Sequence, residues 1–112
     1  MNIQIFGKSK SFDTKKAERW FKERRIKYQY IDLASKGVSP GEYRSIRSAV
    51  GSFDALVDTG CRAYEELFMA YITPQAAEEK LLEHPELFAA PIVRNGRQAT
   101  VGHHPEIWQT WE

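Results

Sequence analysis

Residues 91–101, PIVRNGRQATV, contain the strongest local structural pattern in the chain and decide its fold. The dipeptide Asn95-Gly96 separates two short runs that suit β-strands, 91–94 and 97–101. Asn-Gly favours the type I′ turn that joins antiparallel strands, because both turn residues adopt positive φ angles. We therefore predict a β-hairpin over these residues.

The N-terminal residues predict a β-α-β unit. Residues 2–6, NIQIF, form the first predicted strand, with both isoleucines on one face. Asp13 is the predicted N-cap of a helix over 14–25, and the alternating pattern of 26–33, IKYQYIDL, predicts a second strand. Two strands joined by a crossover helix pair in parallel with a right-handed connection, so the hairpin adds an antiparallel pair to them.

The remaining segments predict helices. A capping box at residues 39–42, SPGE, starts a helix that Gly51 ends. Further helices are predicted over about 62–68, over about 74–83 and after Pro105. Together these elements predict an α/β domain of thioredoxin-like fold. It has a four-stranded mixed sheet flanked by helices, with a helical insert between the βαβ half and the ββα half.

Composition narrows the classes of function and location. The 112 residues suffice for a single domain, and a formal net charge of +1 gives no general attraction for nucleic acid or an anionic membrane. No apolar run reaches the roughly 20 residues of a membrane-spanning helix, and MNIQIFGKSK has no apolar stretch long enough for a signal peptide. We therefore expect a cytoplasmic protein. A single cysteine, Cys61, excludes an intrachain disulfide, a CxxC motif and a cysteine-rich zinc site.

Four segments follow one another in an order that is typical of a known family. They are IQIFGKSKSFDTKKAERWF (3–21), ALVDTGCRAYEEL (55–67), LLEHPELFAAPIVRNGRQATVG (81–102) and a terminal helix with tryptophans. This ordered set resembles the ArsC/Spx family, which includes glutaredoxin-linked arsenate reductases and Spx-type transcription regulators. The resemblance spans nearly the whole chain and implies a thioredoxin-like fold of thiol-redox lineage.

The resemblance implies a nucleophilic cysteine in the loop between the first strand and the first helix. There the unpaired N–H groups and dipole of the helix stabilise a thiolate and bind oxyanions. Aligning residues 15–17, KKA, with the family places Ser11 at the cysteine, or Phe12 if the loop shifts by one residue. The anion- or thiol-binding residues implied around it are Lys8, Lys10, Phe12, Lys15, Ala90 and Pro91, the last as a cis-proline that faces the loop.

The arginines that hold the oxyanion in arsenate-reducing members are missing from this alignment. Ala90 stands at one of the positions, Asp58 at a second, and His103 or His104 at a third. We therefore expect that the sequence as written is not a competent arsenate reductase.

Three interpretations of Ser11 stay open. Its hydroxyl could cap the first helix by accepting a backbone N–H, the loop could be an anion pocket that has lost its thiol, or Ser11 could replace a cysteine of the natural protein. Four lysines surround the loop and would favour phosphate, sulfate or a glutathione carboxylate in such a pocket. They are Lys8, Lys10, Lys15 and Lys16.

The remaining candidate residues favour structural roles. Cys61 falls in the middle of the chain, away from the expected active-site loop, and is interpreted as a small, partly buried residue rather than a reactive thiol beside Arg62. We interpret His84, His103 and His104 as surface or capping residues with no metal site. The three tryptophans are interpreted as packing residues.

Two functions from different classes fit these features. The first is a thiol-redox protein related to arsenate reductases and glutaredoxins, with glutathione or glutaredoxin as its partner and no bound cofactor. The second is a regulatory or binding module of the Spx type, a branch in which the fold contacts RNA polymerase. Such a role depends on surface contacts and does not require a thiol. We expect a monomer. We expect no nucleic-acid partner, because the chain is near neutral and the lysine cluster is only local.

Overall fold

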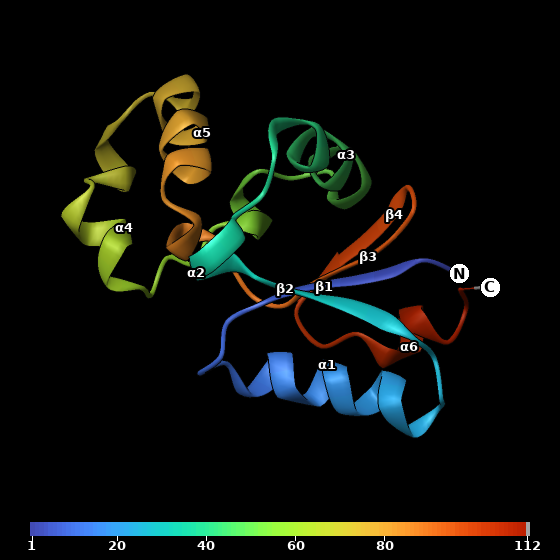
Figure 1. Cartoon of the computed structure of the whole chain (residues 1–112). Coiled ribbons are helices and arrows are strands. Elements are labelled where there is room, and N and C mark those ends of the chain that lie inside the picture. Colours follow the sequence, from blue (N-terminus) through green and yellow to red (C-terminus); the bar gives the residue numbers. More distant parts are fainter. Residues whose placement is uncertain (112) are drawn as a thin grey trace.

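Four strands form one mixed sheet in the computed structural model, which describes residues 1–111. The strands, in the sheet order β2-β1-β3-β4, are β1 (Ile3–Gly7), β2 (Tyr28–Asp32), β3 (Ile92–Asn95) and β4 (Gln98–Val101) (Figure 1). β1 pairs in parallel with β2 and antiparallel with β3, and β3 pairs with β4 across the turn at Gly96. The predicted hairpin and the thioredoxin-like α/β fold are therefore confirmed. The predicted type I′ turn at Asn95-Gly96 is wrong, because Asn95 pairs with Gln98 and the two turn residues are Gly96 and Arg97, of which only Gly96 has a positive φ.

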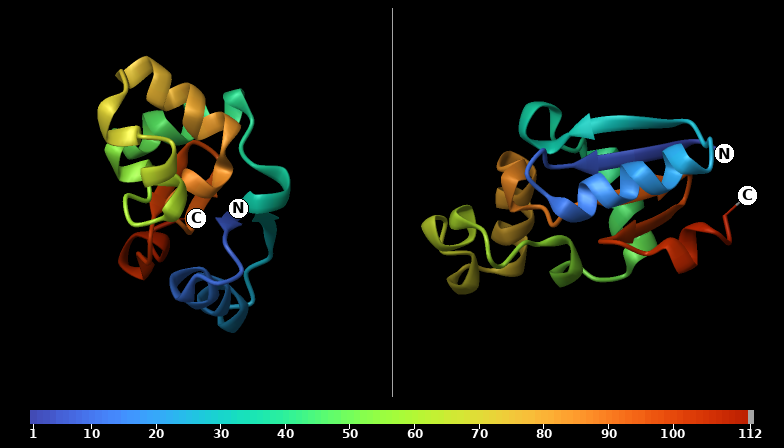
Figure 2. Two further views of the ribbon diagram at one scale, coloured as in Figure 1. Left: turned by 90° about the vertical axis from the view of Figure 1, so that its left-hand side faces the viewer. Right: turned by 90° about the horizontal axis from the view of Figure 1, so that it is seen from below.

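Helices cover both faces of this sheet. The α-helices are α1 (Phe12–Glu23), α2 (Leu33–Lys36), α3 (Pro40–Val50), α4 (Arg62–Glu66), α5 (Pro74–Glu83) and α6 (Pro105–Trp108). Short 3₁₀ helices lie between them at η1 (Asp54–Leu56), η2 (Met69–Tyr71) and η3 (Pro85–Leu87). α1 and α6 lie on one face and α3 on the other, while α4 and α5 lie at the end of the molecule away from the N-terminus (Figures 1 and 2).

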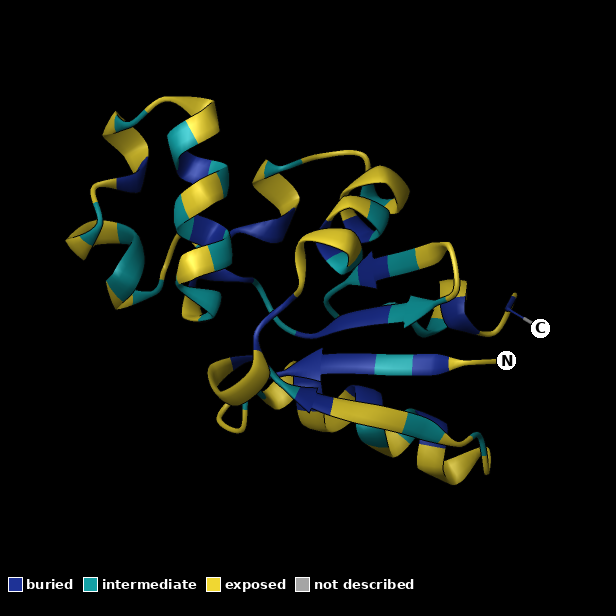
Figure 3. Ribbon diagram, turned by 45° about the horizontal axis from the view of Figure 1, so that its top comes forward, coloured by how far each residue is buried: buried dark blue, intermediate teal, exposed yellow. Residues whose placement is uncertain are grey.

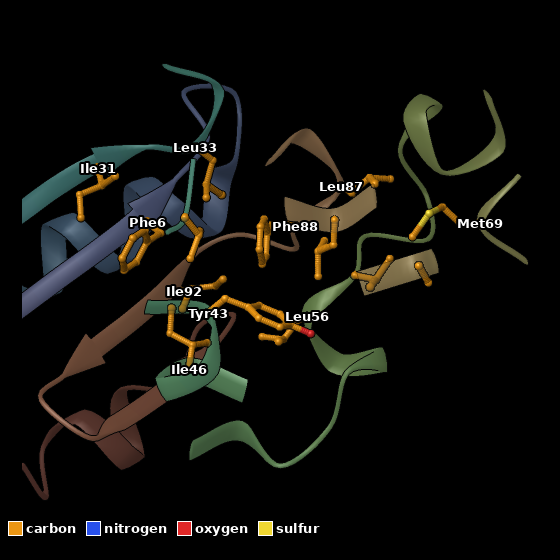
Figure 4. Close-up of a cluster of buried hydrophobic side chains, with 14 residues drawn as sticks. Phe6, Ile31, Leu33, Tyr43, Ile46, Leu56, Met69, Leu87, Phe88 and Ile92 are labelled. Carbon is orange, nitrogen blue, oxygen red and sulfur yellow. The ribbon is translucent and has the colours of Figure 1, made fainter. Parts of the chain in front are cut away.

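β1 separates two hydrophobic cores, because successive side chains of a strand point to opposite faces. Ile3 and Ile5 lie in the core under α1 and α6, together with Ala17, Phe21, Val93, Trp108 and Trp111. Phe6 lies in the other core (Figure 4), whose further members include Ile31, Leu33, Tyr43, Ile46, Leu56, Leu87, Phe88 and Ile92. Because β1 is buried from both sides, the loop that follows it starts from a fixed position.

The C-terminal helix is anchored by its first tryptophan. Trp108 is buried, and its indole Nε1–H donates a hydrogen bond of 2.8 Å to Thr100 Oγ1 of β4. Its ring packs against those of Phe21 and Trp20 of α1, with centroid distances of 5.3 and 5.5 Å. The packing role predicted for the tryptophans is confirmed by the burial of Trp108 and Trp111 and by these contacts.

The first helix begins earlier than the sequence predicts. It spans Phe12–Glu23, its N-cap is Ser11, and the prediction of Asp13 as the N-cap of a helix over 14–25 is wrong. The reason is geometric: the Ser11 hydroxyl accepts the backbone N–H of Thr14 at 3.1 Å, which leaves Asp13 inside the first turn.

The second strand is shorter than the predicted segment 26–33. Arg25 adopts a positive φ of 59° after α1, and pairing with β1 begins only at Tyr28. At the other end, the Asp32 carboxylate accepts the N–H of Ala34 at 3.1 Å and starts α2. The alternating pattern therefore overstated the strand at both ends. At the C-terminal end the Asp32 side chain caps the next helix and competes with the sheet for the backbone.

The caps of the middle helices agree with the sequence. Ser39 and Glu42 form the predicted capping box of α3, and the Thr73 hydroxyl accepts the N–H of Ala76 at 3.2 Å to start α5. The helix predicted over about 62–68 ends at Glu66 and is followed by Phe68 in the left-handed conformation. Within residues 1–111, no helix is long and apolar enough to span a bilayer.

Candidate functional site

The loop between β1 and α1 is closed by its own hydrogen bonds. The Ser11 N–H donates to the Lys8 carbonyl at 3.0 Å, and the Lys8 N–H donates to Thr14 Oγ1 at 3.3 Å. With the bond from the Thr14 N–H to Ser11 Oγ, these contacts hold residues 8–14 as one compact turn. The interpretation of Ser11 as a helix cap is confirmed, and a catalytic role for it remains a prediction.

The close approach of Thr14 requires a glycine at the end of β1. A Cβ atom at Gly7 would lie 2.4 Å from Thr14 Cγ2 and 2.8 Å from the ring of Tyr30, which no ordinary contact permits. Gly7 therefore allows the first turn of α1 to lie directly against the strand, and this contact sets the position of Ser11.

Lys8 is engaged inside the protein rather than free for a ligand. Its Nζ lies 3.4 Å from Asp58 Oδ2 and donates a hydrogen bond of 2.9 Å to the Glu86 carbonyl. Asp58 is the residue at one of the positions where the family resemblance implied an arginine, so a carboxylate now faces the loop. The charge of Lys8 is therefore paired within the protein instead of being available to an oxyanion.

The other lysines of the predicted cluster, together with Phe12, lie on the surface of the loop and of the first turn of α1. Lys10, Lys15 and Lys16 are exposed, and Phe12 is 79% exposed. The Lys15 ammonium lies 6.0 Å from the centroid of the Phe12 ring, at the limit of a cation–π contact. This surface is therefore positively charged and partly aromatic.

Pro91 lies at the strand end next to the loop. The Ala90–Pro91 peptide bond is cis, as the resemblance implied, and Pro91 is buried. The antiparallel register pairs Phe6 with Ile92, so Pro91 comes next to the end of β1 from which the loop starts. Ala90 contributes only a methyl group there, and its side chain offers no charge for an anion.

Cys61 lies beside the Ser11 loop, and the prediction that it is remote from this loop is wrong. It lines a cavity of about 320 Å³ together with Lys8, Ser9, Lys10 and Leu33. The segment before it is tied to the chain near β3, because the Asp58 N–H donates to the Leu87 carbonyl at 2.7 Å and Val57 pairs with Phe88. Cys61 is half-buried, as expected for a small apolar residue.

His84 is the C-cap of α5, and its Nδ1 lies 4.0 Å from Glu86 Oε1, whereas His103 and His104 make their contacts near α6. His104 Nδ1 lies 3.0 Å from Glu106 Oε1, and hydrogen bonds from the Glu106 backbone and from His104 lower the pKa of the Glu106 carboxyl. The His103 ring packs edge-on against Trp108, with a centroid distance of 5.4 Å. In the described part of the chain, no group of three or more His, Cys, Asp or Glu residues is placed to hold a metal ion.

Sequence reasoning thus located the loop but missed two of its partners. The resemblance pointed to Ser11 and Pro91, which both lie at one end of the sheet. The Lys8–Asp58 ion pair and the approach of Cys61 join residues about half a chain apart. No local pattern in the sequence signals such contacts. The sequence did show an acidic residue, Asp58, at a position where the family resemblance implied an arginine.

Comparisons with known proteins find one relative by sequence and several by fold. No protein-family model matches the chain. The chain is 29% identical over 109 residues to global transcriptional regulator Spx 2 of Oceanobacillus iheyensis, which covers 95% of this chain and 80% of that protein. Among solved structures, an ArsC family related protein from Bacteroides fragilis matches with a TM-score of 0.87 at 21% identity, over 98% of this chain and 97% of that one.

A second solved structure gives the same result. An arsenate reductase from Vibrio cholerae matches with a TM-score of 0.86 at 23% identity, over 98% of this chain and 97% of that one. At such identities the structural likeness shows the fold alone. Together with the sequence likeness to Spx 2, it supports an assignment of the chain to the ArsC/Spx family of thioredoxin-like proteins.

Proposed function

We propose that this chain is a regulatory member of the ArsC/Spx family that acts through protein–protein contacts and does not reduce arsenate. The observation that carries the proposal is the bond from the Thr14 N–H to Ser11 Oγ. The helix N-terminus, where the family places its thiolate, is occupied by a hydroxyl that caps the helix. A capping serine has no redox chemistry, and no positioned base activates it as a nucleophile among the contacts of Ser11.

The charges around the loop support the same proposal. An arsenate site needs cations that hold the oxyanion while the thiol attacks. Here Lys8 is paired with Asp58 at 3.4 Å, and Ala90 has no charge. Replacing the hydroxyl oxygen of Ser11 by sulfur would therefore still leave the oxyanion without cationic side chains to hold it.

The sequence likeness supports a regulatory role. The relative at 29% identity over 109 residues is a global transcriptional regulator, Spx 2. The resemblance to the Spx branch implies surface contacts with RNA polymerase. Such a role is compatible with the single cysteine, since surface contacts need no thiol. The proposed site of action is the cytoplasm, with RNA polymerase as the partner.

Two measurements test this proposal. The first is binding of the purified chain to RNA polymerase from Oceanobacillus iheyensis, measured by biolayer interferometry with reductant and with oxidant. We expect binding in the micromolar range or tighter that does not respond to the redox state, because one cysteine cannot form an intrachain disulfide. Absence of binding would contradict the proposed partner.

The second measurement is arsenate reduction with glutathione and glutaredoxin, for the unchanged chain and for Cys61→Ser. We expect no turnover from either protein. Turnover by the unchanged chain that is lost in Cys61→Ser would overturn the proposal, because Cys61 beside the loop would then be the working thiol.

A further inference from the structure

Exposed aromatic side chains gather at the end of the molecule formed by α4 and η2. Two hollows of about 400 and about 310 Å³ lie there and share Thr59 and Tyr64. We call their combined surface the aromatic groove and define it by Phe53, Asp54, Tyr64, Glu65, Phe68 and Tyr71. It lies far from α1 and α6 (Figures 1 and 2), in a region where exposed residues are frequent (Figure 3).

Phe68 is held outward by an unfavourable backbone conformation. Its φ of 54° and ψ of 40° are left-handed, which a bulky residue adopts only at a cost in free energy. Its side chain is nevertheless 64% exposed, so burial of the ring does not compensate for this conformation. Tyr71 is 86% exposed in the same groove. Two large exposed rings that line one hollow are typical of a surface that binds another molecule.

The charge of the aromatic groove is negative. Asp54 and Glu65 are its charged lining residues, and no lysine or arginine among residues 1–111 lines either hollow. The neighbouring Arg62 pairs with a carboxylate of its own helix, its Nε lying 3.7 Å from Glu66 Oε1. A ligand that fits this surface therefore carries positive charge beside apolar groups.

We infer that the aromatic groove docks a basic, apolar segment of a partner protein, with lysine or arginine residues facing Asp54 and Glu65. Arginine and lysine side chains pack well on aromatic rings and pair with carboxylates, and apolar side chains fill the space between Tyr64, Phe68 and Tyr71. The inference rests on the proposed regulatory role for the existence of a partner. It adds the surface that is used and the chemistry of the segment.

The test uses two fluorescein-labelled peptides, KLLKKLLKKLLK and ELLEELLEELLE, titrated with the full chain and followed by fluorescence anisotropy. We expect the basic peptide to bind at least about tenfold more tightly than the acidic one, and less tightly as salt is added. Equal binding of both peptides would overturn the inference, since it would show apolar association without charge recognition.

Variants assign the binding to the groove. Phe68→Gly removes the ring and suits the left-handed backbone, so the protein is expected to stay folded while the basic peptide binds at least about tenfold more weakly. Glu65→Gln is expected to weaken binding by about threefold to tenfold. The controls are Ile107→Ser on α6 and Glu23→Gln on α1, two exposed positions that we expect to leave binding unchanged.

The outcomes separate this inference from the proposed function. Peptide binding that survives Phe68→Gly contradicts the groove, even if RNA polymerase still binds. Groove-dependent peptide binding without RNA polymerase binding contradicts only the proposed partner. Sedimentation of the unchanged chain and of Phe68→Gly completes the test: a dimer that is lost in the variant would show that a second copy, and not a basic segment, occupies the groove.

Discussion

The Lys8 ammonium lies 3.4 Å from the Asp58 carboxylate, and this ion pair joins the Ser11 loop to the segment that carries Cys61. The same ammonium donates to the Glu86 carbonyl in η3, so one side chain connects three parts of the chain. A site that binds an oxyanion needs a cation that is free to contact the anion. The Lys8 ammonium instead binds Asp58 and the Glu86 carbonyl of the protein itself.

Removing the charge of Asp58 should free Lys8 for an anion. We expect Asp58→Asn to bind phosphate measurably more tightly than the unchanged chain, as seen in amide chemical-shift changes of Lys8 to Ser11 during a phosphate titration. Asparagine keeps the oxygen that accepts the Gly60 N–H, and the half-exposed ion pair contributes at most about 1 kcal/mol, so the fold should persist. Glu66→Gln, which breaks an exposed pair on α4, is the control. Identical phosphate titrations of both variants would contradict this prediction.

Loss of the Ser11 cap should destabilise the protein. Ser11→Ala leaves the Thr14 N–H without its partner at 3.1 Å, and the expected loss in unfolding free energy is about 0.5–2 kcal/mol by urea denaturation. Ser11→Asp restores an acceptor at the N-cap and should regain most of this loss. Equal stability of the alanine variant and the unchanged chain would show that the bond is not formed in solution.

A thiol at position 11 should be acidic but not arsenate-reducing. In Ser11→Cys made together with Cys61→Ser, the positive end of α1 and the nearby lysines should lower the thiol pKa below the ordinary value of about 8.5. The rate of iodoacetamide alkylation against pH measures it, with unchanged Cys61 in the parent chain as the reference thiol. Arsenate turnover by the double variant is expected to stay absent, because Ala90 and Asp58 provide no oxyanion-binding cation. An ordinary alkylation profile would argue against an activating loop.

The hydrogen bond between Trp108 and Thr100 should contribute strongly to stability. Thr100→Val keeps the shape of the side chain but leaves the buried indole N–H unpaired, which costs about 1–3 kcal/mol of unfolding free energy. Thr110→Val removes an exposed hydroxyl that donates to the Ile107 carbonyl, and its effect should be much smaller. Urea denaturation followed by tryptophan fluorescence compares the two variants, and a smaller effect at position 100 than at position 110 would refute the assignment.

Tyr28 should make the stability of the protein fall in alkali. Burial, and then the hydrogen bond to Glu18 at 2.9 Å, raise the pKa of Tyr28 to about 12, above the value of about 10 in an unfolded chain. The stabilisation is therefore complete below pH of about 10 and is lost as pH rises to about 12, since the unfolded chain releases its proton first.

The comparison with Tyr28→Phe isolates this effect. The phenylalanine variant should be less stable than the unchanged chain near neutral pH, and the difference should shrink between pH of about 10 and about 12. Urea denaturation at several pH values measures it. Tyr43→Phe should behave in the same way, because burial and the Glu78 carboxylate also raise the pKa of Tyr43. Stability differences that stay constant with pH would contradict this prediction.

Local patterns in the sequence determined most of the fold. The capping box at Ser39 and the cap at Thr73 lie where the sequence predicts them, because each depends on neighbouring residues alone. The predicted hairpin also forms, but its turn lies one residue later, at Gly96-Arg97. The parallel pairing of β1 with β2 also followed from the helix between them. The family resemblance then located the loop that ends in Ser11.

The tertiary structure alone decided how that loop is used. Ser11 and Asp13 are both good N-cap residues by type. Thr14 packs against Gly7, the last residue of β1, and this contact places the Thr14 N–H where the Ser11 hydroxyl accepts it. The pairing of Lys8 with Asp58 and the approach of Cys61 span about half the chain, and they arise from the way the helical insert folds back on the sheet. A single sequence records each of these side chains but not their distances, because such contacts depend on the packing of whole elements rather than on neighbours.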